Sequence, residues 1–555
     1  MAKKKASQKK ETTANKSFSQ KLLDGIERVG NKVPHPVLMF LYLIIGVVVL
    51  SHILYLAGVS VTEEIAVPIV TEEIEAQDYI DSSEPLAGYL PDDPYEFEYE
   101  IQEETIAVQS LLTIDGIRFI FTSFVGNFAS FSVVAVVLVA MVGVGVAEEA
   151  GLMSALIRRI VKVTPRQLIT FILVFVGVLS SVATDAGYLI LIPLGALAFM
   201  SVGRHPLAGI AAAFGGVSAI FAVNIFIAPV DAMITEITNE AILLAGGEPI
   251  TIVANYYFAV ASTILLSIVA ALVTDYVIEP RLGAYTPTAD VPQEEVQDKA
   301  AEAAETRGLK YALYAFLAML VFVLLITLPP GAPLRDPNTG SIIGNTPFMT
   351  SLVFIITLFF LMAGLGYGIG AKTFSSSADV ITGVNKTFAG LAGLIFMLLM
   401  ISQFIAFFNF TNIPQVVAIA MAGSLEQADI GALPLLLGFV LVIMLLNIII
   451  PNVVPKWAIF APIFIPVFMR LDVAPQTVLA AYRLGDSPTN VITPLMVYLP
   501  FVLTIVQRYQ KDAGIGTVIA LMLPYTLIIS VVWIVLFIIW FVLGIPLGPG
   551  YPVTM

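Results

Sequence analysis

The chain has 555 residues, of which 58% are hydrophobic and only 12% are charged, and its net charge is −14. A soluble chain of this length needs far more charge to cover its surface, so we expect most of it to lie in a membrane. It has no Cys, which excludes disulfides and thiolate chemistry, and its three His lack metal-ligand spacing. It also has no GxxxxGK[ST] loop and no GxGxxG fingerprint after a strand, so ion gradients are left as the energy source for any transport.

The amino-terminal part is a basic tail followed by an apolar span and an acidic loop. Residues 1–33 are Lys-rich and too polar for a signal peptide. The positive-inside rule places this tail in the cytoplasm, so the span at 36–57 exits and the acidic loop 59–112 is external. A second span at 130–147 returns to a basic cytoplasmic loop that holds Arg158, Arg159, Lys162 and Arg166.

The next stretch, residues 168–202, is apolar but interrupted by Ser, Thr, Asp and Gly, and it is basic on both sides. This pattern predicts a re-entrant hairpin that enters and leaves on the cytoplasmic face. A span at 206–235 then exits and one at 256–277 returns, which completes a first transporter half at 34–278. The polar residues 279–310 are predicted to be a cytoplasmic linker.

The remaining residues, 311–555, form the predicted second half. Its apolar stretch 433–469 is broken by two prolines and two polar residues near its middle, and we predict a second hairpin there, entered from outside. The predicted spans of this half are 311–328, 351–365, 388–410, 475–506 and 519–543. The sequence thus predicts an all-α membrane protein with nine transmembrane helices and two re-entrant hairpins.

The two interrupted regions match each other without gaps at an offset of 269 positions, as in Pro206 with Pro475 and Ser218 with Ser487. Chance alignment in an apolar chain is one explanation and an ancient duplication is the other. The charge pattern puts the first hairpin inside and the second outside, so the repeats are inverted. Inverted structural repeats with discontinuous helices are typical of secondary transporters, whose site lies near the bilayer midplane.

Ionisable residues at membrane depth are candidate functional groups, because burying them there costs free energy. In RLGDSPTNVITP, residues 483–494, a Gly and a Pro interrupt the helix and leave carbonyls free. With Asp486, Ser487 and Asn490 they form an oxygen environment suited to a proton or to Na⁺, the latter through Asp486 and Asn490. The planar fork of Arg483 suits a substrate carboxylate; the alternative is a buried Arg–Asp pair that only joins two half-helices.

The hairpin tips add further candidates. Asp185 in SSVATDAGY is predicted to contact ion and substrate. In PNVVPKW, Asn452 and Trp457 are candidate substrate contacts, although membrane Trp is more often an interfacial residue. Lys456 either extends to the interface or pairs with an acid. The equivalent region of the first half offers Ser218, Asn224 and Asp231.

The stretches ERVGNKVPHPVLMF, DAGYLILIPLGALAFMSVGRHPLAG, KWAIFAPIFIPVFM and GDSPTNVITPLM resemble the aminobenzoyl-glutamate transporter (AbgT) family. The resemblance implies a homodimer of nine-span, two-hairpin protomers in the inner membrane, with the N-terminus in the cytoplasm. It implies transport rather than enzyme activity, a small-molecule substrate, and no cofactor or nucleic-acid partner. The family's functional aspartate, tryptophan, arginine, second aspartate and proline fall on Asp185, Trp457, Arg483, Asp486 and Pro494.

Members of that family import p-aminobenzoyl-glutamate or export sulfonamide antimetabolites, coupled to the proton or sodium gradient. This sequence departs from the family pattern at Val454, where a serine is expected, and at Ala228-Pro229, where Gly-Thr is expected. Both changes remove hydroxyls near the predicted site and bear on the substrate. An intramembrane enzyme is one alternative function, but these motifs contain no nucleophile paired with a base. A channel is another alternative, and it would be recognised by flux that is neither saturable nor coupled.

Overall fold

The computed structural model describes residues 36–68, 99–182, 187–285, 299–344, 346–427 and 431–555. The predicted basic tail and Asp185 lie outside these residues. The first half contains α3 (Pro36–Leu56), β1 (Ser60–Pro68), β2 (Tyr99–Ala107), α4 (Ile114–Ala129), α5 (Ser132–Glu149), α6 (Leu152–Val163), η2 (Arg166–Leu168), α7 (Ile169–Ser180), η3 (Gly187–Leu191), α8 (Ile192–Ser201), α9 (Pro206–Phe214), η4 (Gly215–Ala219), α10 (Pro229–Leu244), α11 (Tyr256–Val273), η5 (Thr274–Ile278) and α12 (Glu279–Leu282).

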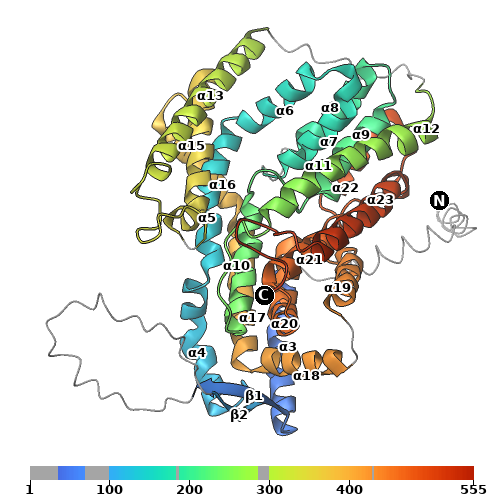
Figure 1. Ribbon diagram of the computed structural model, residues 1–555. Helices are drawn as coiled ribbons and strands as arrows, with labels where there is room; N and C mark the ends of the chain where they lie inside the picture. Colours follow the sequence, from blue (N-terminus) through green and yellow to red (C-terminus); the bar gives the residue numbers. More distant parts are fainter. Residues whose placement is uncertain (1–35, 69–98, 183–186, 286–298, 345, 428–430) are drawn as a thin grey trace, which may run out of the picture.

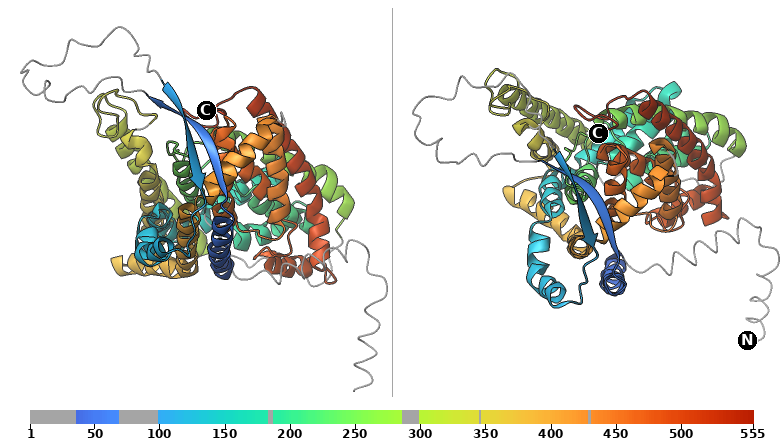
Figure 2. Two further views of the ribbon diagram at one scale, coloured as in Figure 1. Left: turned by 90° about the horizontal axis from the view of Figure 1, so that it is seen from below. Right: turned by 60° about the horizontal axis from the view of Figure 1, so that its bottom comes forward.

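The second half is also built from helices and connecting loops. It contains α13 (Lys299–Thr327), α14 (Pro347–Thr350), α15 (Leu352–Ala371), α16 (Ser377–Gly390), α17 (Ala392–Phe410), α18 (Ile413–Gln427), α19 (Ala432–Asn447), α20 (Val453–Arg470), α21 (Pro475–Asp486), α22 (Leu499–Tyr509) and α23 (Ile515–Val542). Figures 1 and 2 show these helices gathered into one body, with β1 and β2 projecting beside α3 and α4.

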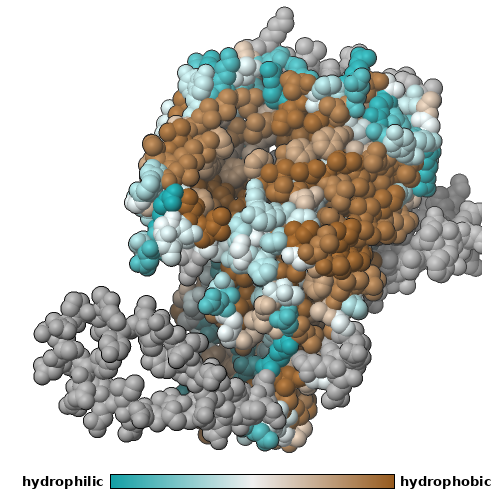
Figure 3. All heavy atoms as spheres, in the orientation of Figure 1, coloured by the Kyte–Doolittle hydropathy of each residue, from teal (hydrophilic) through white to brown (hydrophobic). Residues whose placement is uncertain are grey.

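The membrane fold predicted from hydropathy is confirmed. Within the described residues, eight helices are long and apolar enough to cross a bilayer, and the number is nine if the pair α6 and η2–α7, bent by 118°, counts as one span. The apolar surface of these helices forms a broad band in Figure 3. The side from which each hairpin enters the membrane stays a prediction.

Two predicted spans are each divided in the structure. The span expected at 206–235 consists of α9 with η4, and of α10, separated by residues 220–228, which we call the first break. The span expected at 475–506 consists of α21 and α22, separated by residues 487–498, which we call the second break. Pro229 begins α10 at a position where its missing N–H does no harm. These interruptions leave backbone groups free near the middle of the fold.

The internal repeat is visible in the element bounds. The offset of 269 positions relates the end of α8 at Ser201 to the end of α20 at Arg470. The starts of α9 and α21 obey the same offset. These two coinciding element boundaries favour duplication over chance.

The acidic loop expected at 59–112 contains a β-ribbon that the prediction omitted. Ser60 pairs with Ala107 in an antiparallel register that runs to the far ends of both strands. The strand sequences VTEEIAVP and EIQEETIA contain the β-branched residues Val, Ile and Thr, which favour strands, but they lack a regular two-residue alternation of apolar and polar residues. Helix α4 begins at Ile114, directly after the predicted loop, and fills the residues before the span predicted from 130.

The predicted linker 279–310 is partly helical. α13 begins at Lys299 because its first residues, KAAEAAETR, are strong helix formers. Further along, α13 packs closely on α15. A Cβ on Gly366 of α15 would lie 2.7 Å from the carbonyl oxygen of Tyr311, so only glycine permits this approach of the two backbones.

Candidate functional site

The two interrupted helices meet near the middle of the fold, and side chains from the second one bind the backbone of the first. The Ser487 hydroxyl accepts a hydrogen bond from the Ala222 amide at 3.0 Å and donates one to the Arg483 carbonyl at 3.1 Å. The Asn490 amide donates to the Ser218 carbonyl at 3.4 Å. The free carbonyls of one break are therefore partly satisfied by the other, which joins the two halves of the protein at this point.

Arg483 bridges the halves most directly. Its Nη1 donates to the Ala222 carbonyl at 2.9 Å and to the Asp231 carboxylate, with which it forms an ion pair. The side chain is only 3% exposed, and its Nε–H has no acceptor among the described residues. Asp231 also accepts from the Ala228 amide at 2.7 Å and so caps the N-terminus of α10, where a negative charge is favoured. A buried guanidinium N–H without an acceptor can bind an anionic oxygen.

A second buried ion pair joins the second hairpin to the second break. The Lys456 ammonium lies 2.6 Å from Asp486 Oδ1, and both side chains are 1% exposed or less. Lys456 also donates to Asn447 Oδ1, and the Asn447 amide donates to Thr489 Oγ1 and Asn490 Oδ1, each at 2.8 Å. Apart from this ammonium, no donor from the described residues reaches either carboxylate oxygen of Asp486.

The oxygens predicted to hold Na⁺ therefore already have partners. Asp486 faces an ammonium and Asn490 accepts from an amide, so a metal ion at this point has to displace Lys456. The described residues contain no group of three or more His, Asp or Glu side chains arranged to hold a metal. Of the three predicted ion contacts, Asp486 pairs with Lys456 and Asn490 is linked to Lys456 through Asn447, whereas the hydroxyl of Ser487 binds the Ala222 amide and the Arg483 carbonyl.

Trp457 lies against both halves but has no free surface. Its Nε1–H donates to Thr238 Oγ1 at 2.9 Å and to the Ile234 carbonyl at 3.2 Å, and its ring stacks on Tyr482 with centroids 4.3 Å apart. The side chain is completely buried. An aromatic ligand reaches Trp457 only when Tyr482 or α10 moves.

Asn224 ties the first break to the first hairpin. Its Nδ2 donates to the Val178 carbonyl at 2.9 Å and to the Ser181 hydroxyl at 3.0 Å. In the other half, Thr493 donates from its hydroxyl to the Ile448 carbonyl at 2.7 Å, at the position related to Asn224 by the offset of 269. The repeats thus use different side chains to hold each hairpin against its break.

The other predicted residues lie at the edges of this region. Asn452 is exposed and caps α20, accepting from the Val454 amide at 3.3 Å. Pro494 is half-buried within the second break. Sequence reasoning missed Asn447, although a polar side chain in the apolar helix ALPLLLGFVLVIMLLN was a signal at membrane depth.

Comparisons with known proteins agree with this architecture. Residues 21–555 match the AbgT putative transporter family. The p-aminobenzoyl-glutamate transport protein of Escherichia coli (strain K12) is 32% identical over 538 residues, which cover 97% of this chain and 98% of that protein.

Two solved structures share the fold. The YdaH transporter of Alcanivorax borkumensis, described as having an unusual topology, matches with a TM-score of 0.81 and 37% identity over 93% of this chain and all of that chain. MtrF of Neisseria gonorrhoeae, described within a class of antimetabolite efflux pumps, matches with a TM-score of 0.81 and 36% identity over 96% of this chain and all of that one. Family, sequence and fold agree over nearly the whole length, and the chain belongs to the AbgT putative transporter family.

Proposed function

We propose that the protein is an ion-coupled secondary active transporter of p-aminobenzoyl-glutamate or a similar carboxylated aromatic compound. The family and the printed name of the Escherichia coli relative support this substrate class. Inverted repeats with interrupted helices support alternating access around one site at their junction.

The main support for the proposal is the environment of Arg483. Its side chain is a buried guanidinium at the junction of the two breaks, with one N–H left without an acceptor. A substrate carboxylate supplies that acceptor and competes with Asp231 for the same cation. Charge-assisted bonds of this kind are stronger than neutral ones and are geometrically selective for carboxylates.

The aromatic end of the substrate is proposed to bind against Trp457. The contact requires a conformation in which the ring stacked on it, Tyr482, has moved aside. Asp185, Asn224, Asn452 and Pro494 complete the proposed substrate contacts, at the hairpin tips and the two breaks. Val454 and Ala228-Pro229 remove hydroxyls near these contacts, which favours a substrate with fewer polar groups facing them.

Coupling is proposed to act through Asp486, Ser487 and Asn490, with Asp185 as a second ion contact. The geometry sets a condition on the ion. Because the Lys456 ammonium already neutralises Asp486, Na⁺ binds there only if the Lys456 side chain moves away. A proton that binds the Asp486 carboxylate only has to break this ion pair. We propose further that the protein works as a homodimer with its N-terminus in the cytoplasm.

Uptake of labelled p-aminobenzoyl-glutamate into proteoliposomes, with and without an imposed proton or sodium gradient, tests the proposal. Arg483→Lys keeps the ion pair with Asp231 but loses the planar fork, so we expect a raised KM with a folded protein. Arg281→Gln removes one exposed cation elsewhere and serves as the control. Uptake that is the same with and without the proton and sodium gradients contradicts ion coupling. An unchanged KM in Arg483→Lys removes Arg483 from the substrate site.

A second candidate function is export of sulfonamide-type antimetabolites. The similarity to MtrF, described among antimetabolite efflux pumps, favours it. An alternating-access cycle runs in either direction according to its coupling. Sulfonamide sensitivity of cells with and without the protein, compared with uptake into inside-out vesicles, separates export from import.

A further inference from the structure

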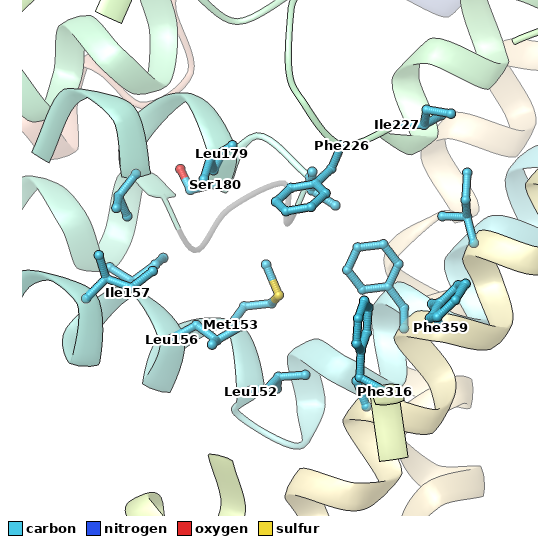
Figure 4. Close-up of a pocket in the computed structure, with 16 residues that line it drawn as sticks. Leu152, Met153, Leu156, Ile157, Leu179, Ser180, Phe226, Ile227, Phe316 and Phe359 are labelled. Carbon is cyan, nitrogen blue, oxygen red and sulfur yellow. The ribbon is translucent and has the colours of Figure 1, made fainter. Parts of the chain in front are cut away.

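An apolar cavity lies apart from the junction of the two breaks. Its volume is about 380 Å³, and α6, α7, α13, α15 and the first break line it. Figure 4 shows Met153, Phe226 and Phe316 directed into the same space. Fifteen of its sixteen lining residues are apolar, and the exception, Ser180, already donates its hydroxyl to the Gly177 carbonyl at 2.7 Å. Among the lining residues that the structure describes, none is left to bind a charged ligand.

The cavity lies at the depth of the hydrocarbon. Phe316 lies about 16 Å from the C-terminal end of α13, and Phe359 about 10 Å from the N-terminal end of α15, at 1.5 Å per residue. Both positions fall near the middle of a hydrocarbon core about 30 Å thick. Only 17% of the α13 span is buried within the protein, so the outer face of this wall is free to contact lipid or a second subunit.

A second cavity of about 470 Å³ continues the first toward the end of the molecule that carries the basic residues of α6. The two share Leu152, Leu156, Phe316 and Ala363. The second cavity adds Arg159 from α6 and Lys310 from α13. Together they make one continuous space with an apolar deep end and two cations at its shallow end.

These two cations are available to a ligand. On the same helices, Arg158 pairs with Glu305 at 2.9 Å and Lys162 pairs with Glu302 at 2.6 Å. Arg159, beside these pairs, makes no hydrogen bond or close ion pair with a described residue, although its charge is felt by Glu302; Lys310 makes none either, and both are exposed. The positive-inside rule places this basic end at the cytoplasmic leaflet.

We propose that this continuous space is a binding site for an anionic glycerophospholipid of the cytoplasmic leaflet. An acyl chain fills the deep apolar cavity between α7, α13 and α15, and the phosphate lies between Arg159 and Lys310. Basic pockets between membrane helices on the cytoplasmic side bind lipid headgroups by the same charge complementarity. The lipid then packs between α13 and the first hairpin, next to Phe226 of the first break.

Two other occupants fit less well. A dicarboxylate cargo would place charge against fifteen apolar residues, which is unfavourable without a paired cation there. A second copy of the chain could cover α13 from outside, but it does not fill a space that extends inward to Phe226. The lipid satisfies both ends of the site at once.

The test is native mass spectrometry of the full-length protein, delipidated and titrated with phosphatidylglycerol or with phosphatidylcholine. Arg159→Gln with Lys310→Gln should weaken phosphatidylglycerol binding about 30-fold, since each surface cation contributes about fivefold. Leu156→Gln, at an exposed lining position, should weaken both lipids by placing an amide against the acyl chain. Arg281→Gln removes a cation that lines neither cavity and should bind both lipids as the unmodified protein does.

Chain length supplies an independent readout. Dihexanoyl phosphatidylglycerol should bind far more weakly than the long-chain lipid, by on the order of fourfold for each buried methylene lost. The proposal is overturned if the double Gln variant keeps its preference for the anionic lipid, or if chain length has no effect. It is also overturned if the same variants shift the thermal stabilisation by p-aminobenzoyl-glutamate, or the dimer mass, while lipid binding stays unchanged.

Discussion

The buried pair of Lys456 and Asp486 makes a quantitative prediction about stability. Both side chains are 1% exposed or less, so removing one partner leaves a buried charge without its direct counter-charge. Breaking such a pair costs about 3–5 kcal/mol. We expect Asp486→Asn and Lys456→Met each to lower the free energy of unfolding by that amount.

The double variant should recover most of the loss. Lys456→Met with Asp486→Asn leaves no buried charge, and its main cost is the Asn447 carbonyl oxygen, which loses its donor. An unsatisfied buried acceptor costs about 1–3 kcal/mol. The sum of the single losses is about 6–10 kcal/mol, so the coupling free energy should be at least about 3 kcal/mol.

Unfolding by SDS in mixed micelles, followed by circular dichroism and extrapolated to zero SDS, measures these free energies. The pair of Arg118 and Asp115 is the matched control, since it has the same 2.6 Å separation but is 65% and 79% exposed. Its coupling should stay below about 1 kcal/mol. A coupling free energy near that of the control would refute the reasoning.

Ion-coupled uptake by folded Asp486→Asn should be lost, and coupled flux at the level of the unmodified protein would show that Asp486 has only a structural role.

Three further predictions concern other contacts. Trp457→Phe keeps the aromatic ring but loses the indole N–H donor to Thr238, so we expect stability to fall by about 1 kcal/mol in the same unfolding assay; an unchanged value contradicts it. Burial lowers the pKa of His205, the cap of α9, below 6.5, so the folded state binds fewer protons and loses stability as the pH falls through that pKa. Below pH 6.5 the Tm of His205→Asn should therefore fall less than that of the unmodified protein, and an equal fall would exclude His205 as the cause. Gly209→Ala would place a Cβ 2.1 Å from the Gly195 carbonyl oxygen, so we expect a loss of about 1–3 kcal/mol, and a Tm equal to the unmodified protein's would show that α8 and α9 can separate.

Much of the fold followed from patterns along the chain. The prolines and polar residues near 451–456 and the apolar stretches on either side predicted the interruptions that separate α19 from α20. The offset that relates Pro206 to Pro475 predicted equivalent helices, and the structure places both at the start of their helix. The β-ribbon of β1 and β2 was missed, because its strands carry a high density of charge and no regular two-residue alternation, so only their β-branched residues pointed to strands.

The candidate site was harder to predict because its contacts join distant parts of the chain. Sequence reasoning left two partners open for Arg483, namely Asp486 and a substrate carboxylate. In the structure Arg483 pairs with Asp231 of the other half, and Asp486 pairs with Lys456. Which carboxylate meets which cation depends on how the interrupted helices cross, and no local pattern encodes that crossing.

By itself, the sequence determined that this is a polytopic helical membrane protein with two repeated, interrupted regions, because hydropathy and helix-breaking residues act locally along the chain. Only the tertiary structure decided that Trp457 is buried against Tyr482 and that the Lys456 ammonium pairs with Asp486, in the oxygen cluster predicted for a metal ion. It also decided that Arg159 and Lys310 line a cavity next to the apolar one. These features arise where helices distant in sequence pack together, and burial and ion pairing are properties of that packing.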